Sequence, residues 1–128
     1  MAMTQPIPLK MRADIAKDKF MRYCIYKDDT APNHDCYGRV EWEHAFMHTG
    51  RRLNEPWAIV PCCTSHNRGK GLVKEYNQYR ALLRAQEMLP GGIEDLVRRY
   101  PRVDWKQKLK YLHGKYGKET LQPNGIRK

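Results

Sequence analysis

Three cysteines and a histidine have the side chains and spacing of a metal site. Cys24 and Cys36 are separated by eleven residues, and Cys63 is followed three positions later by His66. A Cys-x2-His pair brings two ligands together over one turn of chain, and three thiolates with one imidazole are a common set for structural zinc. The adjacent Cys62 could replace Cys63, and buried free cysteines without a ligand role are the alternative interpretation. The pattern predicts a zinc site.

A second group of residues has the chemistry of a hydrolytic site. Glu43 and His44 are consecutive, and Asn67 follows His66 at a predicted helix start. Carboxylate and amide oxygens suit a hard cation such as Mg²⁺, and a neutral imidazole can accept a proton. Successive strand residues point to opposite faces, which opposes a shared role for Glu43 and His44 unless the strand bends or ends there. Asn67 also suits a helix cap, and a lone histidine is more often structural.

The charge distribution favours a nucleic-acid partner. The chain carries 24 Lys or Arg against 14 acidic residues, a net charge of +10 with a pI near 9.6, and residues 98–128 hold ten basic and two acidic residues. Such a basic tail is typical of proteins that bind phosphate backbones, although a solvated surface is the simpler interpretation. The residues expected to contact the backbone are Arg51, Arg52, Arg68, Lys70, Lys106 and Lys110.

The elements that must position these residues follow from apolar periodicity. Residues 39–47 and 57–61 read as strands, and residues 9–20, 66–88, 93–100 and 104–116 read as helices. At 128 residues the chain is expected to form one domain, with an N-terminal arm and short helix over 1–20, a core over 21–90 and a basic helical extension over 91–128. Its mean hydropathy is −0.84, so a metal would help to stabilise a modest core.

Membrane and secreted classes are not expected. No apolar run approaches the roughly 18–20 residues that a membrane span needs, and the N-terminal stretch lacks the apolar segment of a signal peptide. A reducing compartment follows, in which four cysteines favour thiols and metal over disulfides.

The order of these features resembles a known family. The stretch GRVEWEHAFMHTGRRLNEPWAIVPCCTSHNRGK, residues 38–70, resembles the HNH nucleases with their ββα-metal (His-Me) finger. The resemblance covers roughly residues 21–90 and is closest to phage HNH proteins and the endonuclease VII type. It implies an α+β fold: a ββα-metal core with a short antiparallel hairpin, flanking helices and a structural zinc.

The resemblance also implies roles for individual residues. His44 matches the general base, Glu43 and Asn67 match the ligands of a catalytic Mg²⁺ or Mn²⁺, and the zinc positions are matched by Cys24, Cys36, Cys63 and His66. Many members have His-His where this chain has Glu43-His44. In an alternative alignment His66 binds the catalytic metal. The middle asparagine of the motif has Asn54 as its candidate, whereas many relatives carry it at the position of Ala58.

The function implied is a metal-dependent endonuclease that hydrolyses DNA phosphodiester bonds and leaves a 5′ phosphate. Double-stranded or branched DNA is the expected substrate, and a double-strand cut would need a homodimer or two visits. If phage or prophage encoded, the protein would act in the bacterial cytoplasm. The alternatives are a zinc-stapled nucleic-acid-binding module without catalysis and an accessory HNH protein of a phage recombination or packaging complex.

Overall fold

The computed structural model describes residues 7–27, 31–32, 36–48, 50–68 and 73–117, with the side chains of Asn67 and Arg68 outside that description. The elements in chain order are α1 (Leu9–Ala16), the 3₁₀ helices η1 (Lys19–Arg22) and η2 (Ile25–Lys27), β1 (Val40–His44), β2 (Met47–His48), β3 (Arg51–Arg52), the 3₁₀ helix η3 (Pro56–Ala58), β4 (Ile59–Cys63), α2 (Thr64–Arg68), α3 (Lys74–Met88), α4 (Ile93–Arg99) and α5 (Trp105–Tyr116). This mixture of helices and small antiparallel sheets agrees with the predicted α+β class. Among the described residues, every helix is too short or too polar to traverse a lipid bilayer.

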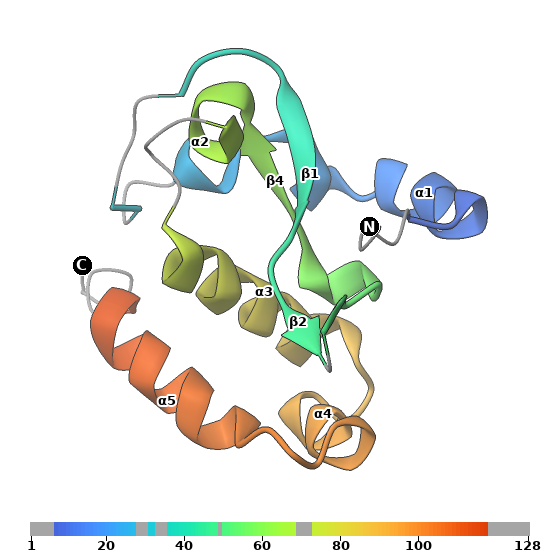
Figure 1. Cartoon of the computed structure of the whole chain (residues 1–128), viewed down its shortest axis with the longest axis vertical. Coiled ribbons are helices and arrows are strands. Elements are labelled where there is room, and N and C mark those ends of the chain that lie inside the picture. Colours follow the sequence, from blue (N-terminus) through green and yellow to red (C-terminus); the bar gives the residue numbers. More distant parts are fainter. Residues whose placement is uncertain (1–6, 28–30, 33–35, 49, 69–72, 118–128) are drawn as a thin grey trace.

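Two small antiparallel sheets form the middle of the molecule. β1 pairs with β4 so that Val40 lies opposite Cys63 and His44 lies opposite Ile59, and β2 pairs with β3. α2 begins at Thr64, immediately after β4 ends. Figure 1 shows α2 beside one end of the β1–β4 pair and β2 beyond the other end. The predicted strands over 39–47 and 57–61 therefore correspond to a pair that leads into a helix. The bounds of the second were wrong: β4 starts two residues later, after η3, and continues through Pro61 to Cys63.

The predicted strand over 39–47 divides in two. β1 ends at His44, and both Ala45 and Phe46 are buried, so the alternation of faces stops there. The Ala45 N–H donates to the Ala58 carbonyl, and the Leu53 N–H donates to the Phe46 carbonyl. The chain thus turns after His44 because two successive side chains enter the core, and the following residues form the separate β2–β3 hairpin.

The predicted helix over 66–88 also divides. α2 ends at Arg68 and α3 begins at Lys74, and Leu72 lies outside the described residues. Gly69 and Gly71 occur between the two helices, and glycine costs about 1 kcal/mol relative to alanine in a helix interior. α3 buries Tyr76, Tyr79 and neighbouring residues.

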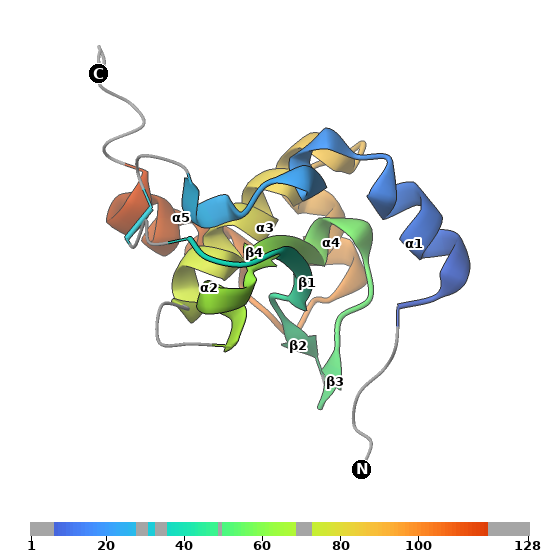
Figure 2. The ribbon, with the colours of Figure 1, turned by 90° about the horizontal axis from the view of Figure 1, so that it is seen from above.

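The predicted helix over 9–20 is shorter than expected. α1 ends at Ala16, and the side chain of Asp18 accepts a hydrogen bond from the Phe20 N–H at the start of η1. Asp is favoured at helix starts, so this residue begins a new turn rather than continuing the old one. Figure 2 shows α1 at the edge of the molecule, and Ile15 is its one buried residue.

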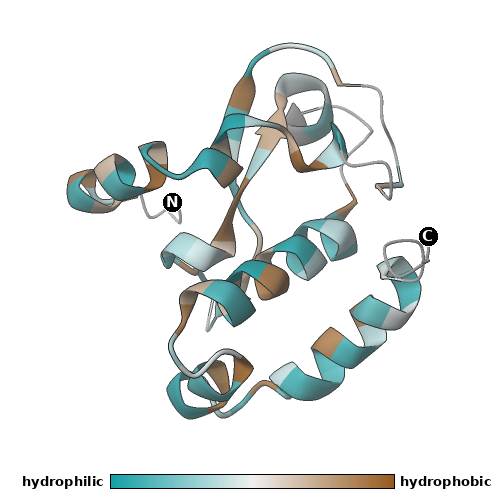
Figure 3. Ribbon diagram, turned by 180° about the vertical axis from the view of Figure 1, so that it is seen from behind, coloured by the Kyte–Doolittle hydropathy of each residue, from teal (hydrophilic) through white to brown (hydrophobic). Residues whose placement is uncertain are grey.

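The core connects the strands to the C-terminal helices. The rings of Phe46, Trp57 and Trp105 contact one another with centroids 5.4–6.0 Å apart. Trp105, Leu112 and Tyr116 place α5 in the same buried cluster as the cysteines. Figure 3 shows α5 as a largely hydrophilic helix interrupted by hydrophobic segments. The helix thus combines a buried apolar face with an exposed lysine-rich one.

Candidate metal centre and adjacent residues

The structure brings the four predicted metal ligands together. One ligand atom each from Cys24, Cys36, Cys63 and His66 lies within 4.8 Å of every other. Nδ1 of His66 lies 3.0 Å from Sγ of Cys63, 3.7 Å from Sγ of Cys24 and 3.8 Å from Sγ of Cys36. Three sulfurs around one imidazole nitrogen form a group that could hold a metal ion such as zinc. We call these four residues the Cys3His cluster.

Strand geometry separates the two neighbouring cysteines. Cys63 points toward His66, whereas Sγ of Cys62 lies 3.8 Å from Nδ2 of Asn77 on α3. Successive residues of a strand point to opposite faces, so only one of the pair can reach the cluster. Within the described part of the chain, Cys62 lies outside the Cys3His cluster. The structure therefore places Cys63, and not the alternative Cys62, in the Cys3His cluster.

Backbone contacts hold the segment after Cys36 against the start of α2. The N–H groups of Thr64 and Ser65 donate to the carbonyls of Arg39 and Tyr37. Gly38 between them has a φ of +87°, and a Cβ there would lie 2.7 Å from the Cβ of Thr64. A glycine is needed at this position both for its backbone angle and for the close approach. This close contact between the two segments brings Cys36 near Cys63.

The three thiols differ in acidity. Burial raises the pKa of Cys63, but hydrogen bonds from Ser65 and from the N–H groups of His66 and Tyr37 outweigh it and lower that pKa to about 5. Burial raises the pKa of Cys24, and burial with the neighbouring thiols raises that of Cys36 to about 12. Cys63 is therefore a thiolate at neutral pH, while the other two would lose their protons on binding a metal.

Glu43 and His44 lie at the end of β1. Both are half-buried, and they lie opposite Val60 and Ile59 of β4. Burial raises the pKa of Glu43, and the positive charge of Arg52 partly offsets this effect. β1 ends at His44, and a strand end is the condition under which the sequence allows Glu43 and His44 to share a role.

Asn54 contacts the candidate general base. Its Oδ1 lies 2.6 Å from Nε2 of His44. An amide oxygen only accepts hydrogen bonds, so this contact is a hydrogen bond in the tautomer whose Nε2 carries the ring proton, and in that neutral tautomer Nδ1 keeps its lone pair. Asn54 was the candidate for the middle asparagine of the resemblance, and Ala58, the alternative position, is buried in η3 without a polar side chain.

Other predicted site residues are placed only in part. Asn67 and Arg68 lie on α2, but their side chains are outside the described structure, as is Lys70. Arg51 and Arg52 form β3 and are exposed.

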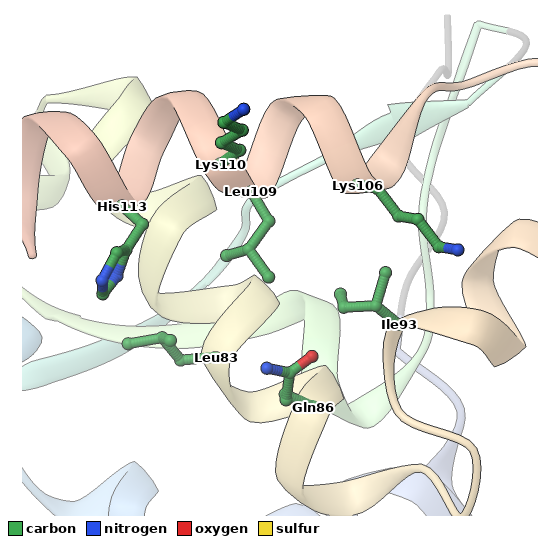
Figure 4. Close-up of a pocket in the computed structure, with 7 residues that line it drawn as sticks. All are labelled: Leu83, Gln86, Ile93, Lys106, Leu109, Lys110 and His113. Atoms are coloured by element: carbon green, nitrogen blue, oxygen red, sulfur yellow. The ribbon is translucent and has the colours of Figure 1, made fainter.

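The predicted lysines of α5 border a groove. It has a volume of about 450 Å³ and an apolar floor that includes Leu83, Ile93 and Leu109. Figure 4 shows these three side chains directed into the space between α3 and α5, with Lys110 pointing away from it. Lys106 forms an ion pair of 2.6 Å with Glu94. The groove contains neither the Cys3His cluster nor Glu43 and His44.

Comparisons with models of protein families, with curated proteins and with solved structures found no match. The functional interpretation therefore depends on the residues and geometry described above.

Proposed function

We propose that the chain is a metal-dependent endonuclease that hydrolyses DNA phosphodiester bonds by nicking or by structure-selective cleavage. The observation that carries the proposal is the connection between the Cys3His cluster and the β1–β4 pair. Cys63 and His66 lie at the β4–α2 join, β4 pairs with the strand that carries Glu43 and His44, and Asn67 follows on α2. A ββα-metal core requires this order of strand, strand and helix.

His44 is the proposed general base. The contact of its Nε2 with Oδ1 of Asn54 favours the tautomer in which Nε2 carries the proton and Nδ1 is the acceptor. Nδ1 would take a proton from the attacking water, a role typically worth about 10²–10⁴-fold in rate. Asn54 would act through His44 as a positioning residue.

Glu43 and Asn67 would hold the catalytic Mg²⁺ or Mn²⁺. Glu43 suits this role because it is a half-buried carboxylate whose charge is incompletely compensated, as its raised pKa indicates. Such a cation supplies stabilisation of the negative charge that develops on the phosphate and leaving oxygens. Glu43 would hold this cation beside His44, its neighbour on β1.

The Cys3His cluster would hold a structural zinc. The four residues of the cluster come from before β1 and from the β4–α2 join, so a bound ion would fasten these segments together.

The basic side chains would bind the DNA backbone. Arg51 and Arg52 lie on the β2–β3 hairpin, which follows β1 along the chain, and Lys106 and Lys110 lie on α5. Contacts to phosphates provide affinity without reading sequence.

Nicking of supercoiled plasmid tests the proposal. Zinc-loaded wild type with Mg²⁺ or Mn²⁺ should convert supercoiled plasmid to open circles, and His44→Ala should be slower by about 10²-fold or more. His113→Ala is the matched control because His113 lies on α5 and hydrogen-bonds Tyr79. Equal nicking rates for wild type and His44→Ala would show that His44 is not the general base.

A nucleic-acid-binding module without catalysis is the second candidate. The Cys3His cluster and the net charge of +10 favour it because neither requires a reaction. Binding of linear and branched DNA without nicking by the zinc-loaded wild type, in Mg²⁺ and in Mn²⁺, would select this function over the endonuclease.

A further inference from the structure

Tyr26 lies against the metal-ligand His66. The two rings are stacked, with centroids 4.2 Å apart and planes inclined by 7°. Both side chains are fully buried, at 0% exposure. Nδ1 of His66 faces the three cysteine sulfurs, so the plane of the imidazole determines whether its lone pair points into the Cys3His cluster. The phenol ring of Tyr26 therefore covers one face of the imidazole whose orientation decides whether His66 can bind a metal in the cluster.

The hydroxyl group of Tyr26 fixes the position of that ring. It accepts a hydrogen bond of 2.9 Å from the N–H of Val73, and it lies 3.1 Å from the carbonyl oxygen of the same residue. It also contacts Oδ1 of Asn77, one turn into α3. Val73 immediately precedes α3, so the hydroxyl connects the stacked pair to the beginning of that helix. Nδ2 of Asn77 in turn faces Cys62, the cysteine outside the cluster.

We propose that Tyr26 is a positioning residue of the metal centre. Its ring holds the plane of His66, and its hydroxyl anchors that plane to the start of α3. Groups outside the ligand set commonly orient a histidine ligand, and their loss typically costs about 10–100-fold in metal affinity. This inference depends on the proposed metal centre but not on the proposed hydrolysis, since it concerns how the cluster holds an ion.

Metal titration of the full chain separates the two functions of Tyr26. Co²⁺ bound to thiolates and imidazole gives visible absorption bands that report ligand geometry, and competition with a chromophoric chelator gives the Zn²⁺ affinity. Tyr26→Phe keeps the ring and removes the hydroxyl, whereas Tyr26→Leu removes both. We expect Tyr26→Leu to weaken Zn²⁺ binding by about 10–100-fold and to alter the Co²⁺ bands, with a smaller loss for Tyr26→Phe.

Tyr79→Phe is the matched control. Tyr79 is also a buried tyrosine, and its hydroxyl bonds His113, which lies outside the cluster. This variant should keep the wild-type Zn²⁺ affinity and Co²⁺ spectrum. A similar loss in Tyr79→Phe and Tyr26→Phe would show a general packing effect and overturn the proposal.

The remaining outcomes are distinguishable. If the wild type binds neither Co²⁺ nor Zn²⁺, the metal centre itself is wrong. If the wild type binds both and folded Tyr26→Leu has the same affinity and spectrum, the positioning role of Tyr26 is wrong. If Tyr26→Leu does not fold by circular dichroism, Tyr26→Phe decides, because wild-type affinity in that variant overturns the hydroxyl anchor.

Discussion

Glu43 is a carboxylate in a position that favours its neutral form. Burial raises its pKa, and Arg52 and His44 only partly offset that effect. Desolvation penalises the charged form, so an ionised Glu43 costs stability until a cation or another positive group compensates it. A residue that costs stability in the absence of a ligand is typical of a functional site.

Replacing Glu43 with glutamine should therefore separate stability from activity. The folded-state pKa is raised, so the ionised side chain destabilises the protein above that pKa and has no such effect well below the ordinary value. In Mg²⁺-free buffer at pH 8, Glu43→Gln should raise Tm by a few degrees while nicking in Mg²⁺ is lost. The gain should shrink as pH falls through the raised pKa. Calorimetry measures the Tm of Glu43→Gln, with Glu41→Gln on the same strand as the control. A Tm of Glu43→Gln below that of the wild type at pH 8 would contradict the prediction.

The adjacent cysteines allow a direct test of the ligand set. Cys63→Ser removes a sulfur 3.0 Å from the His66 nitrogen, whereas Cys62→Ala changes a side chain that faces α3. We expect about one zinc per chain in wild type and in Cys62→Ala, and a loss of at least about tenfold in affinity for Cys63→Ser. Metal analysis after gel filtration measures both. Zinc retention by Cys63→Ser together with zinc loss by Cys62→Ala would reverse the assignment.

The members of the Cys3His cluster were predictable from residue types, but its neighbours were not. Ligand type and spacing predict Cys24, Cys36, Cys63 and His66. The choice between Cys62 and Cys63 needed the register of β4, because adjacent residues differ only in the face to which they point. The stack of Tyr26 on His66 joins residues 40 positions apart, and no local pattern signals such a contact.

The loop between β3 and η3 carries Asn54 and is fastened by its next residue. The carboxylate of Glu55 accepts hydrogen bonds from Nε1 of Trp57, from the hydroxyl of Tyr100 and from the guanidinium of Arg99. Arg99 ends α4, and Tyr100 follows it. The C-terminal half of the chain thus helps to hold the residue that contacts His44.

Glu55→Gln should weaken this connection. Hydrogen bonds to charged groups contribute about 1.5–3 kcal/mol, and part of the Arg99 interaction is exposed, so we expect the free energy of unfolding to fall by about 1–2 kcal/mol. Urea denaturation measures the change. Glu94→Gln is the control, because the Glu94–Lys106 pair is exposed on both sides and should contribute less than about 1 kcal/mol. Equal effects of the two substitutions would contradict the special role of Glu55.

Element types were predictable where periodicity is strong, and their ends were not. The helices over 93–100 and 104–116 agree with α4 and α5 to within about one residue at each end. The predicted strand over 39–47 failed beyond His44 because Ala45 and Phe46 both enter the core. The predicted helix over 66–88 is interrupted before Lys74, because Val73 has an extended backbone.

The molecule is small, and its Cys3His cluster connects segments that are far apart in sequence. Cys24 and His66 lie 42 positions apart, and the cluster joins the region of η1 and η2 to the β4–α2 join. A chain of this length buries only about two thirds of its unfolded surface. We therefore expect the ion to stabilise the whole fold, and not only its own loops.

Removal of the metal should lower Tm substantially. At a free zinc concentration 100 times the Kd, binding contributes about 2.7 kcal/mol, which corresponds to about 10 °C in a chain of this size. Scanning calorimetry with and without a chelator measures the difference, and re-addition of Zn²⁺ should restore it. Cys63→Ser is the control and should respond much less to the chelator. An unchanged Tm in chelated, metal-free wild type would exclude a stabilising ion.

The division of the ligands between two stretches of chain has a consequence for biosynthesis. Cys24 and Cys36 leave the ribosome before Cys63 and His66, so for part of translation the nascent polypeptide carries two thiols without the partners that complete the coordination shell. Metal uptake by the proposed site would then be a late event, because it needs the β4–α2 join. Until that moment oxidants and other thiols would compete for the same sulfurs, and the yield of metal-loaded protein would depend on how soon the histidine arrives.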